Sequence, residues 1–289
     1  MIRRIALLVN PVSAGGRALK ALPSVRAELD RMGAAHRTVT TRSLEHAAEE
    51  AAAAGEPTVV ALGGDGLLGA VAGALRGADT AMAIVPCGRG NDLARVLSVP
   101  KRPELAARVA LHGTERLLDV ATVDGRPFMG IASFGLDSDA NAIANRARLV
   151  KGPAVYLYAA LRALAAWRPA RFVVIVDGTR HEASGYSVAV GNSRAYGGGM
   201  RILPRAELDD GRLDVMLTKD TSKLTFLRTL PKVFRGAHVD SPHCLFLRGE
   251  GVEVASDRPF EIYADGDPIG ATPATITIQP RCLRVMVPS

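Results

Sequence analysis

The chain has 289 residues, enough for about two domains of ordinary size. Hydrophobic residues make up 48% and charged residues 22%, which is typical of a folded globular protein and excludes an intrinsically disordered one. The net charge of +7 is compatible with nucleotides, nucleic acid or an anionic membrane surface as partners, and does not choose among them.

Over the first 125 residues, short apolar runs alternate with longer helical patterns. Strands that are separated by helices of 10–15 residues indicate βαβ units and a parallel sheet. We predict strands at Ile5–Val9, Thr38–Thr40, Thr58–Leu62 and Ala81–Val85, and helices at Arg17–Met32, Leu44–Ala54 and Leu67–Leu75.

The pattern changes near Asp119, where β-like runs punctuated by Gly, Pro and Asp begin. Eight such runs favour an antiparallel β-sandwich, with a helical insert at about 138–167. The runs are Leu118–Val123, Phe128–Ile131, Phe172–Val176, Tyr186–Val190, Leu213–Leu217, Val252–Ala255, Glu261–Ala264 and Thr275–Ile278. The predicted fold class is therefore α/β, with a parallel-sheet domain first and a mainly antiparallel β-sandwich second.

Cysteine usage and hydropathy bear on the compartment. Cys87, Cys244 and Cys282 are far apart and form no CxxC motif, so we expect neither a disulfide framework nor a structural zinc site. The apolar run near the N-terminus has only about five residues, which is too short for a signal peptide. No run of about 18 apolar residues occurs, so no membrane span is predicted. These features favour a cytoplasmic protein.

A glycine-rich turn follows the third predicted strand, in the sequence Gly63-Gly64-Asp65-Gly66. Glycines between a strand and a helix let backbone amides approach a phosphate, and the helix N-terminus adds partial positive charge. A carboxylate there would repel phosphate unless it acts through Mg²⁺ or accepts a proton from an incoming hydroxyl. The turn also fits GxGxxG, but it lacks the context of a dinucleotide site. The alternative that these residues form a tight turn that binds no ligand is left open.

Two further glycine-rich turns follow the first and fourth strands, in NPVSAGGRA (residues 10–18) and VPCGRGNDLAR (residues 85–95). Taken singly, the second of them needs no ligand, because Asn91 and Asp92 can cap a helix. Taken together, the three turns lie at the carboxyl ends of parallel strands, along the sheet edge where open α/β folds bind ligands. A nucleotide site is therefore favoured.

The three turns NPVSAGG, GGDGL and PCGRGND resemble the diacylglycerol kinase catalytic domain shared by bacterial lipid kinases, sphingosine kinases and ceramide kinases. The second half continues the match in GNSRAYGGGMRILPRAELDDGRLDV (residues 191–215) and YADGDPIG (residues 263–270). The resemblance implies an ATP-binding domain with the NAD-kinase-like or phosphofructokinase-like fold at residues 1–124, completed by a C-terminal strand at 281–289. Residues 125–280 would form the β-sandwich on the lipid side, with ATP in the cleft between the domains.

The resemblance also implies roles for individual residues. Asp65, Asp92 and Asp119 match an acidic network for catalytic Mg²⁺, while Asp210, with the backbone carbonyls of Glu207 and Arg212, matches a second, structural Mg²⁺ site. Asp65 and Asp267 are the two candidates for the catalytic base. The residues that match nucleotide-binding positions are Asn10, Pro11, Val12, Ser13, Ala14, Thr41, Gly63, Gly64, Asp65, Gly66, Leu67, Leu68, Gly69, Gly88, Arg89 and Asn91.

Three positions depart from the family pattern. Ala70 replaces a Glu that usually follows the GGDG turn, which removes one polar contact. Arg89 replaces a usual Thr, and its guanidinium could bind phosphate bidentately. Asp267 replaces a Glu and is one methylene shorter, so the choice between Asp65 and Asp267 as the base is left open.

The implied activity is transfer of the γ-phosphoryl group of ATP to a lipid hydroxyl, with Mg²⁺ as cofactor. Diacylglycerol, giving phosphatidic acid for phospholipid biosynthesis, is the first expected acceptor; a sphingoid base or a polyprenol is the alternative. An NAD kinase is disfavoured by the later motifs, and a pseudokinase that binds nucleotide or lipid without turnover stays open. Scattered aromatic residues, at 4%, argue against nucleic-acid binding. A homodimer is left open.

A lipid substrate requires peripheral contact with a membrane, which we expect at its inner face. Residues 222–235 have apolar and basic sides, which fits either a membrane surface or a helix that buries its apolar side in the domain. Pro231 argues against an uninterrupted helix there. The apolar segment Val155–Trp167 fits either a lipid-accepting groove or the core.

Overall fold

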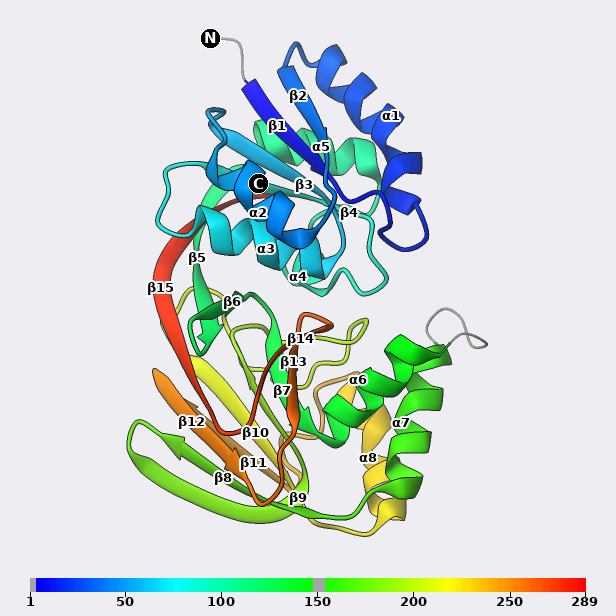
Figure 1. Ribbon diagram of the computed structural model, residues 1–289, viewed down its shortest axis with the longest axis vertical. Helices are drawn as coiled ribbons and strands as arrows, with labels where there is room; N and C mark the ends of the chain where they lie inside the picture. The colour runs from blue at the N-terminus through cyan, green and yellow to red at the C-terminus, as the bar shows by residue number, and fades with distance from the viewer. Residues whose placement is uncertain (1–3, 148–153) are drawn as a thin grey trace. The chain divides into compact units, whose positions relative to one another are not determined.

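The computed structural model describes residues 4–147 and 154–289 (Figure 1). The chain forms two compact units. The first contains the described residues up to Val120 together with Gln279–Ser289, and the second contains Ala121–Ile278.

The first unit is built on a parallel sheet. Its strands are β1 (Arg4–Val9), β2 (Ala35–Thr40), β3 (Thr58–Gly63) and β4 (Ala81–Pro86), in the order β4-β3-β1-β2. Residues 5–9 of β1 are fully buried, as expected for a parallel strand that is covered on both faces. The end of β15 (Ala274–Val287) joins this sheet, with Val285 beside Met82 in parallel register.

Five helices of the first unit follow its strands. They are α1 (Arg17–Arg31), α2 (Leu44–Ala52), α3 (Asp65–Leu75), α4 (Asp92–Val96) and α5 (Pro103–His112). Ser43 begins α2 as its N-cap, because its Oγ accepts the N–H of His46 at 3.1 Å. Helix α5 begins with Pro103, a residue that fits the first helical position. Helix α1 packs on α5 and α2 on α3.

The second unit is mainly antiparallel, and its longest complete strand, β9 (Thr179–Gly191), pairs with three neighbours. The partners are β7 (Ile131–Gly135), β8 (Ala170–Val176) and β10 (Leu213–Lys219). The other strands are β6 (Arg126–Phe128), β11 (Cys244–Gly249), β12 (Gly251–Ser256), β13 (Glu261–Ala264) and β14 (Asp267–Ala271), while β5 (Thr114–Val123) divides between the two units. The predicted fold class, a parallel α/β domain followed by a β-sandwich domain, is confirmed.

The described residues of the second unit form the helices α6 (Leu136–Arg146), α7 (Ala154–Ala166) and α8 (Lys223–Val233). Aromatic side chains join α8 and the end of α7 to the β core. The Phe226 ring of α8 stacks on Tyr186 with centroids 4.6 Å apart, and Trp167, just after α7, stacks on the same ring at 6.3 Å. Helices α6 and α7 lie within the predicted helical insert, whose residues 148–153 are outside the described part.

Helix α8 covers most of the segment expected to be amphipathic. Phe226 and Leu227 pack against the core of the unit, and Val233 is buried. The helix therefore buries part of its apolar side in the domain, while Leu224 and the adjoining Phe234 are exposed. Contact of this segment with a membrane stays a prediction. The expectation that Pro231 interrupts the helix is wrong, because α8 continues through it for two more residues.

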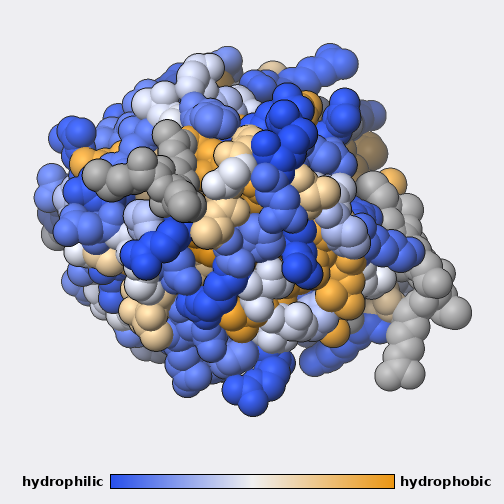
Figure 2. All heavy atoms as spheres, turned by 90° about the horizontal axis from the view of Figure 1, so that it is seen from above, coloured by the Kyte–Doolittle hydropathy of each residue, from blue (hydrophilic) through white to orange (hydrophobic). Residues whose placement is uncertain are grey.

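None of the described residues forms a helix that is both long and apolar enough to cross a bilayer. On the face drawn in Figure 2, hydrophilic side chains predominate, and hydrophobic ones lie between them in separate groups.

Candidate active site

The three glycine-rich loops meet at one edge of the parallel sheet of the first unit. They follow β1, β3 and β4, and cross-loop hydrogen bonds join them. The Ser13 Oγ donates to the carbonyl of Cys87 at 3.3 Å, and the Arg17 Nη1 donates to the carbonyl of Gly88 at 3.0 Å. The loops therefore form one surface rather than three separate turns.

Gly64 and Gly88 bring two of these loops into backbone contact. A Cβ added to Gly88 would lie 2.5 Å from the Cα of Gly64, and one added to Gly64 would lie 2.9 Å from the Cα of Gly88. Real Cβ atoms do not approach backbone so closely, so both positions require glycine for a packing reason. This contact leaves the backbone N–H groups of both loops near each other.

Asp65 is the first residue of α3 and holds the loop after β4. Its Oδ2 accepts the N–H of Asn91 at 2.8 Å, and its Oδ1 accepts the N–H of Asp92 at 2.9 Å. Burial raises the pKa of Asp65 to about 6, and the nearby charge of Asp92 adds to the rise, while the backbone hydrogen bonds oppose it. The carboxylate is thus both a loop anchor and a group that titrates near neutral pH.

The other residues predicted to bind nucleotide lie around these loops. The Asn10 Oδ1 accepts the N–H of Val12 at 3.1 Å, whereas the Val12 side chain is exposed. Leu67 and Leu68 have buried side chains in α3, so only their backbone could contact a nucleotide. The first-turn N–H groups of α3 have no partners within the helix, which suits an anion. The remaining predicted residues are Pro11, Ala14, Gly63, Gly66, Gly69 and Arg89, of which Arg89 is exposed.

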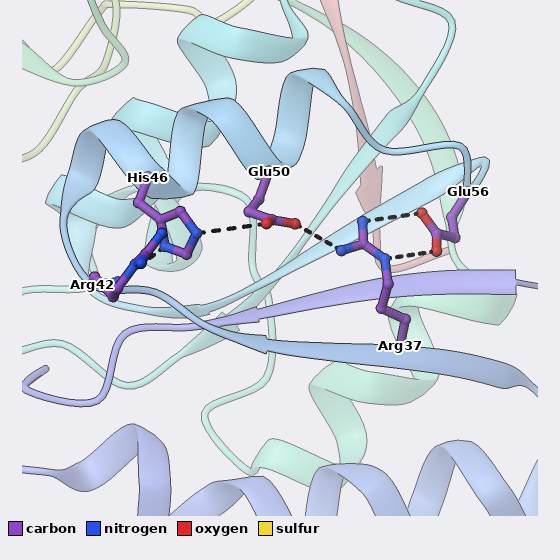
Figure 3. Close-up of polar contacts among 5 residues, drawn as sticks. All are labelled: Arg37, Arg42, His46, Glu50 and Glu56. Atoms are coloured by element: carbon purple, nitrogen blue, oxygen red, sulfur yellow. Dashed lines mark hydrogen bonds and ion pairs between the residues drawn. The ribbon is translucent and has the colours of Figure 1, made fainter.

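Thr41 lies just after β2 and is buried, and its Oγ1 donates to the carbonyl of Val9 at 3.1 Å. A charged network beside it ties this segment to α2 (Figure 3). Arg37 of β2 donates to Glu50 at 2.7 Å and to Glu56 at 3.0 Å. Arg42, which follows Thr41, donates its N–H to the Nδ1 of His46 at 3.2 Å. The sequence suggested no role for any histidine. In the structure, His46 holds the loop after β2 through this hydrogen bond.

Asp119 in β5 is fully buried, and its Oδ1 accepts the N–H of Arg281 at 2.6 Å. Arg281 has a φ of 50°, in the left-handed region, so the carboxylate holds β15 at a bend. The structure therefore gives Asp119 an anchoring role besides the one that the resemblance implies.

This anchoring role leads to a prediction. Asp119→Ala should lower the free energy of unfolding by about 1.5–3 kcal/mol, because it removes a charged acceptor from a backbone N–H. Asp119→Asn keeps an oxygen acceptor and should lose less. Urea denaturation of both variants, with kinase assays alongside, checks this; equal stability of Asp119→Ala and the wild type would contradict the anchor. Loss of activity in a stable Asp119→Asn would indicate a need for the charge itself.

In the second unit, Asp210 and Asp214 lie around Arg248, which forms ion pairs with both. The Asp210 Oδ1 accepts the N–H of Arg212 at 3.0 Å. Burial raises the pKa of Asp214 to about 6, and the charge of Glu207 adds to the rise. The Oδ2 atoms of Asp210 and Asp214 are buried, and both ion pairs with Arg248 are made through them. Asp214 was not selected from the sequence, although it is the last Asp of the motif that ends at Val215.

Residues 4–147 and 154–289 contain no clustered set of metal-ligating side chains. No three His, Cys, Asp or Glu side chains within these ranges lie close enough together to hold a metal ion. The predicted Mg²⁺ network of Asp65, Asp92 and Asp119, which includes water, stays a prediction, and so does the site at Asp210.

Two more carboxylates of the second unit have raised pKa values. Partial desolvation raises the pKa of Asp267, which opens β14. Burial raises the pKa of Asp137 to about 6, although its hydrogen bonds with Tyr196 and Ser187 lower the pKa. The Oδ2 of Asp137 is buried without a hydrogen-bond partner. Sequence reasoning missed Asp137, since it lies in the first turn of α6 and nothing in the local sequence shows its burial.

Comparison with known proteins decides the family. Residues 4–123 match the diacylglycerol kinase catalytic domain, and residues 130–287 match the YegS C-terminal NAD kinase beta sandwich-like domain. The chain is 33% identical to the diacylglycerol kinase of Mycobacterium tuberculosis (strain ATCC 25618 / H37Rv), with 99% of this chain and 96% of that one covered. The chain belongs to the diacylglycerol kinase family.

Other members of the diacylglycerol kinase family agree with this result. The chain is 31% identical to a protein of Pseudomonas aeruginosa (strain UCBPP-PA14) named "Probable lipid kinase YegS-like", with 99% of this chain and 95% of that one covered. A crystal structure of a diacylglycerol kinase from Bacillus anthracis str. Sterne shares the fold, with a TM-score of 0.78 at 21% identity over 99% of this chain and 97% of that one. The predicted family is confirmed, and the chain is an enzyme of the lipid kinase class. Family membership implies ATP as the phosphate donor.

Proposed function

We propose that this enzyme transfers the γ-phosphoryl group of ATP to the hydroxyl of diacylglycerol, giving phosphatidic acid, at the inner face of a membrane. The observation that carries the proposal is the joined set of glycine-rich loops, which Asp65 anchors at the edge of a parallel sheet. The acceptor follows from relatives named diacylglycerol kinase that match the chain along 99% of its length.

Phosphoryl transfer needs positioning and charge stabilisation more than covalent help from the protein. The first turn of α3 supplies fixed N–H donors for phosphate oxygens. The N–H groups of Gly88, Asn91 and Asp92 already donate to side chains within the loops and hold the loops in shape. Arg89 is exposed beside these loops, and among the described residues it forms no ion pair. Its guanidinium can therefore bind a phosphate bidentately, in place of the usual Thr of the family.

The acidic residues fit Mg²⁺ chemically, because this ion prefers oxygen ligands. The negative charges of Asp65 and Asp92 repel each other, and a bound cation would relieve that repulsion. The resemblance also implies a cation at Asp210, with the carbonyls of Glu207 and Arg212 as further ligands. That cation would take the place of Arg248 as the partner of the Asp210 Oδ2. Bound at Asp65 and Asp92, Mg²⁺ would neutralise charge on the phosphates.

The proton of the lipid hydroxyl must pass to a base, and two carboxylates qualify. Asp65 has a pKa of about 6, so at pH 7 it is mostly ionised and still basic enough to accept a proton. Asp267 also has a raised pKa, and among the described residues its carboxylate accepts no hydrogen bond. Comparison of Asp65→Asn with Asp267→Asn assigns the base.

The test is transfer of radiolabelled phosphate from ATP and Mg²⁺ to diacylglycerol, sphingosine, ceramide and a polyprenol in mixed micelles. Label in diacylglycerol that disappears with Asp65→Asn supports the proposal. Label in another of these lipids would identify that lipid as the acceptor and would leave the proposed type of reaction unchanged. ATP binding without label in any lipid contradicts the proposed reaction.

A further inference from the structure

Strands β10 and β11 place one arginine directly opposite one aspartate. Their antiparallel register pairs Asp214 with Arg248, and residues that face each other in this way have side chains on the same side of the sheet, with Cβ atoms about 4.5–5.5 Å apart. The Arg248 Nε lies 3.6 Å from the Asp214 Oδ2. A slip of one residue would also move Val215 and Leu217, which are fully buried, to the other face. The pairing of the two charges is therefore fixed by the packing of the sheet.

The turn before β10 brings a second carboxylate to the same guanidinium. Gly211 has a φ of 72°, and the Asp210 Oδ1 accepts the N–H of Arg212 at 3.0 Å, so the turn closes on its own carboxylate. The other oxygen of this carboxylate, Oδ2, forms an ion pair with the Nη2 of Arg248. One guanidinium thus joins the turn before β10 to the neighbouring strand β11.

The two carboxylates need a cation between them. The Asp214 side chain is 12% exposed and that of Asp210 is 21% exposed, so water screens their mutual repulsion poorly. Glu207 and Arg205 also act on Asp214, but their charges have opposite signs. Arg248 is the cation that contacts both carboxylates, and its removal would leave two like charges with little solvent and without the partner that they share.

The guanidinium and a divalent ion cannot use the same oxygens together. Mg²⁺ takes about six oxygen ligands at about 2.0–2.1 Å, whereas a guanidinium offers only N–H donors and carries a positive charge that repels the ion. An ion at Asp210 would therefore have to displace Arg248 from the Oδ2 atom. Within the described ranges, no third His, Cys, Asp or Glu side chain joins Asp210 and Asp214 in a metal-binding cluster. While Arg248 is in place, the two carboxylates already have their cation.

We propose that Arg248 is the resident cation of this site and takes the place of the Mg²⁺ that the resemblance implies at Asp210. Its guanidinium neutralises Asp210 and Asp214 and ties the turn before β10 to β11, so the second unit keeps its fold without a divalent ion there. A requirement for Mg²⁺ in catalysis then arises at the nucleotide and at Asp65 and Asp92. The proposal concerns the second unit by itself and holds whichever lipid is phosphorylated.

The test is thermal unfolding of the full chain, followed by circular dichroism in EDTA and in millimolar MgCl₂, without ATP or lipid. Arg248→Met keeps an unbranched side chain but removes the charge, and in EDTA it should melt at least about 5 °C below the wild type. MgCl₂ should raise the melting temperature of Arg248→Met more than that of the wild type, because the vacated carboxylates can then bind the ion. Since the assay contains no substrate, its outcome is independent of the proposed reaction.

Further variants assign the effect to this site. Arg171→Met is the matched control, because it removes an ion pair with Glu182 between β8 and β9 of the same unit, and it should respond to MgCl₂ as the wild type does. In Arg248→Met/Asp210→Asn the extra stabilisation by MgCl₂ should disappear, whereas Asp210→Asn alone should leave the wild-type response to MgCl₂ unchanged. The proposal is overturned if Arg248→Met melts like the wild type, or if MgCl₂ stabilises it no more than the wild type. It is also overturned if Asp210→Asn alone reduces the response to MgCl₂, because the divalent ion is then the resident cation.

Discussion

A Gly88→Ala variant is expected to lose at least about 100-fold in kcat/KM and to melt at a lower temperature than the wild type. The added methyl would lie 2.5 Å from the Cα of Gly64, so the loops after β3 and β4 would have to move apart. A misplacement of about 1 Å in a catalytic constellation can cost about 100-fold in rate. The accompanying loss of stability should be about 1–3 kcal/mol, the cost of overpacking a well-packed contact.

Gly55→Ala is the matched control, because its added methyl would meet no atom within 4 Å and its φ is not in the left-handed region. It should keep wild-type activity and stability. Steady-state kinetics and thermal melts on both variants make the comparison. A Gly88→Ala enzyme as active as Gly55→Ala would show that the contact between the loops does not position the phosphates.

The strands and turns of the first unit could be predicted because their signals are local. The strands predicted at Ile5–Val9 and Ala81–Val85 agree with β1 and β4 within one residue at each end. The contact between Gly64 and Gly88 could not be predicted, since two residues 24 positions apart are brought together only by the parallel pairing of β3 and β4. The sequence thus indicated that the glycine-rich loops share one edge of the sheet, but not what holds these loops together.

Burial of individual carboxylates could not be predicted either. Asp137 and Asp214 have pKa values raised to about 6 because the surrounding structure removes water from them. Their neighbours in the chain carry no sign of this, and neither was selected. Asp65 was selected, yet its hydrogen bonds to the N–H groups of Asn91 and Asp92 were not foreseen, since they depend on how two loops meet.

The apolar helices show the same limit. The pattern of residues 222–235 fits membrane contact and core packing equally well, and the structure packs Phe226 and Leu227 into the core. In the segment Val155–Trp167, the structure buries Val155 and Ala159 but leaves Leu157 and Leu161 exposed. An amphipathic pattern identifies a face but not what covers it.

An Asp65→Asn variant should lose at least about 100-fold in kcat, the low end for removal of a general base. The asparagine keeps one oxygen acceptor and replaces the other with an NH₂ group, which cannot accept the second backbone N–H. Part of the loss could therefore arise because the loop at residues 91–93 moves. Binding of ATP, measured by calorimetry, separates the two causes: unchanged affinity with lost turnover assigns the loss to chemistry. Full activity in a folded Asp65→Asn enzyme would refute the assignment.

The pH profile decides whether Asp65 acts as the base. A base must be ionised, and burial raises the pKa of Asp65 to about 6, so kcat/KM should fall as the pH drops through about 6. In a folded Asp65→Asn enzyme that limb should vanish from the residual activity, whereas it should persist in Asp267→Asn. If the limb instead disappears only in Asp267→Asn, then Asp267 accepts the proton and Asp65 serves to hold the loop and its charge. Either result uses the same carboxylate geometry. The N–H groups of residues 91 and 92 donate to the ionised Asp65, whose oxygens become weaker acceptors when the carboxylate is protonated.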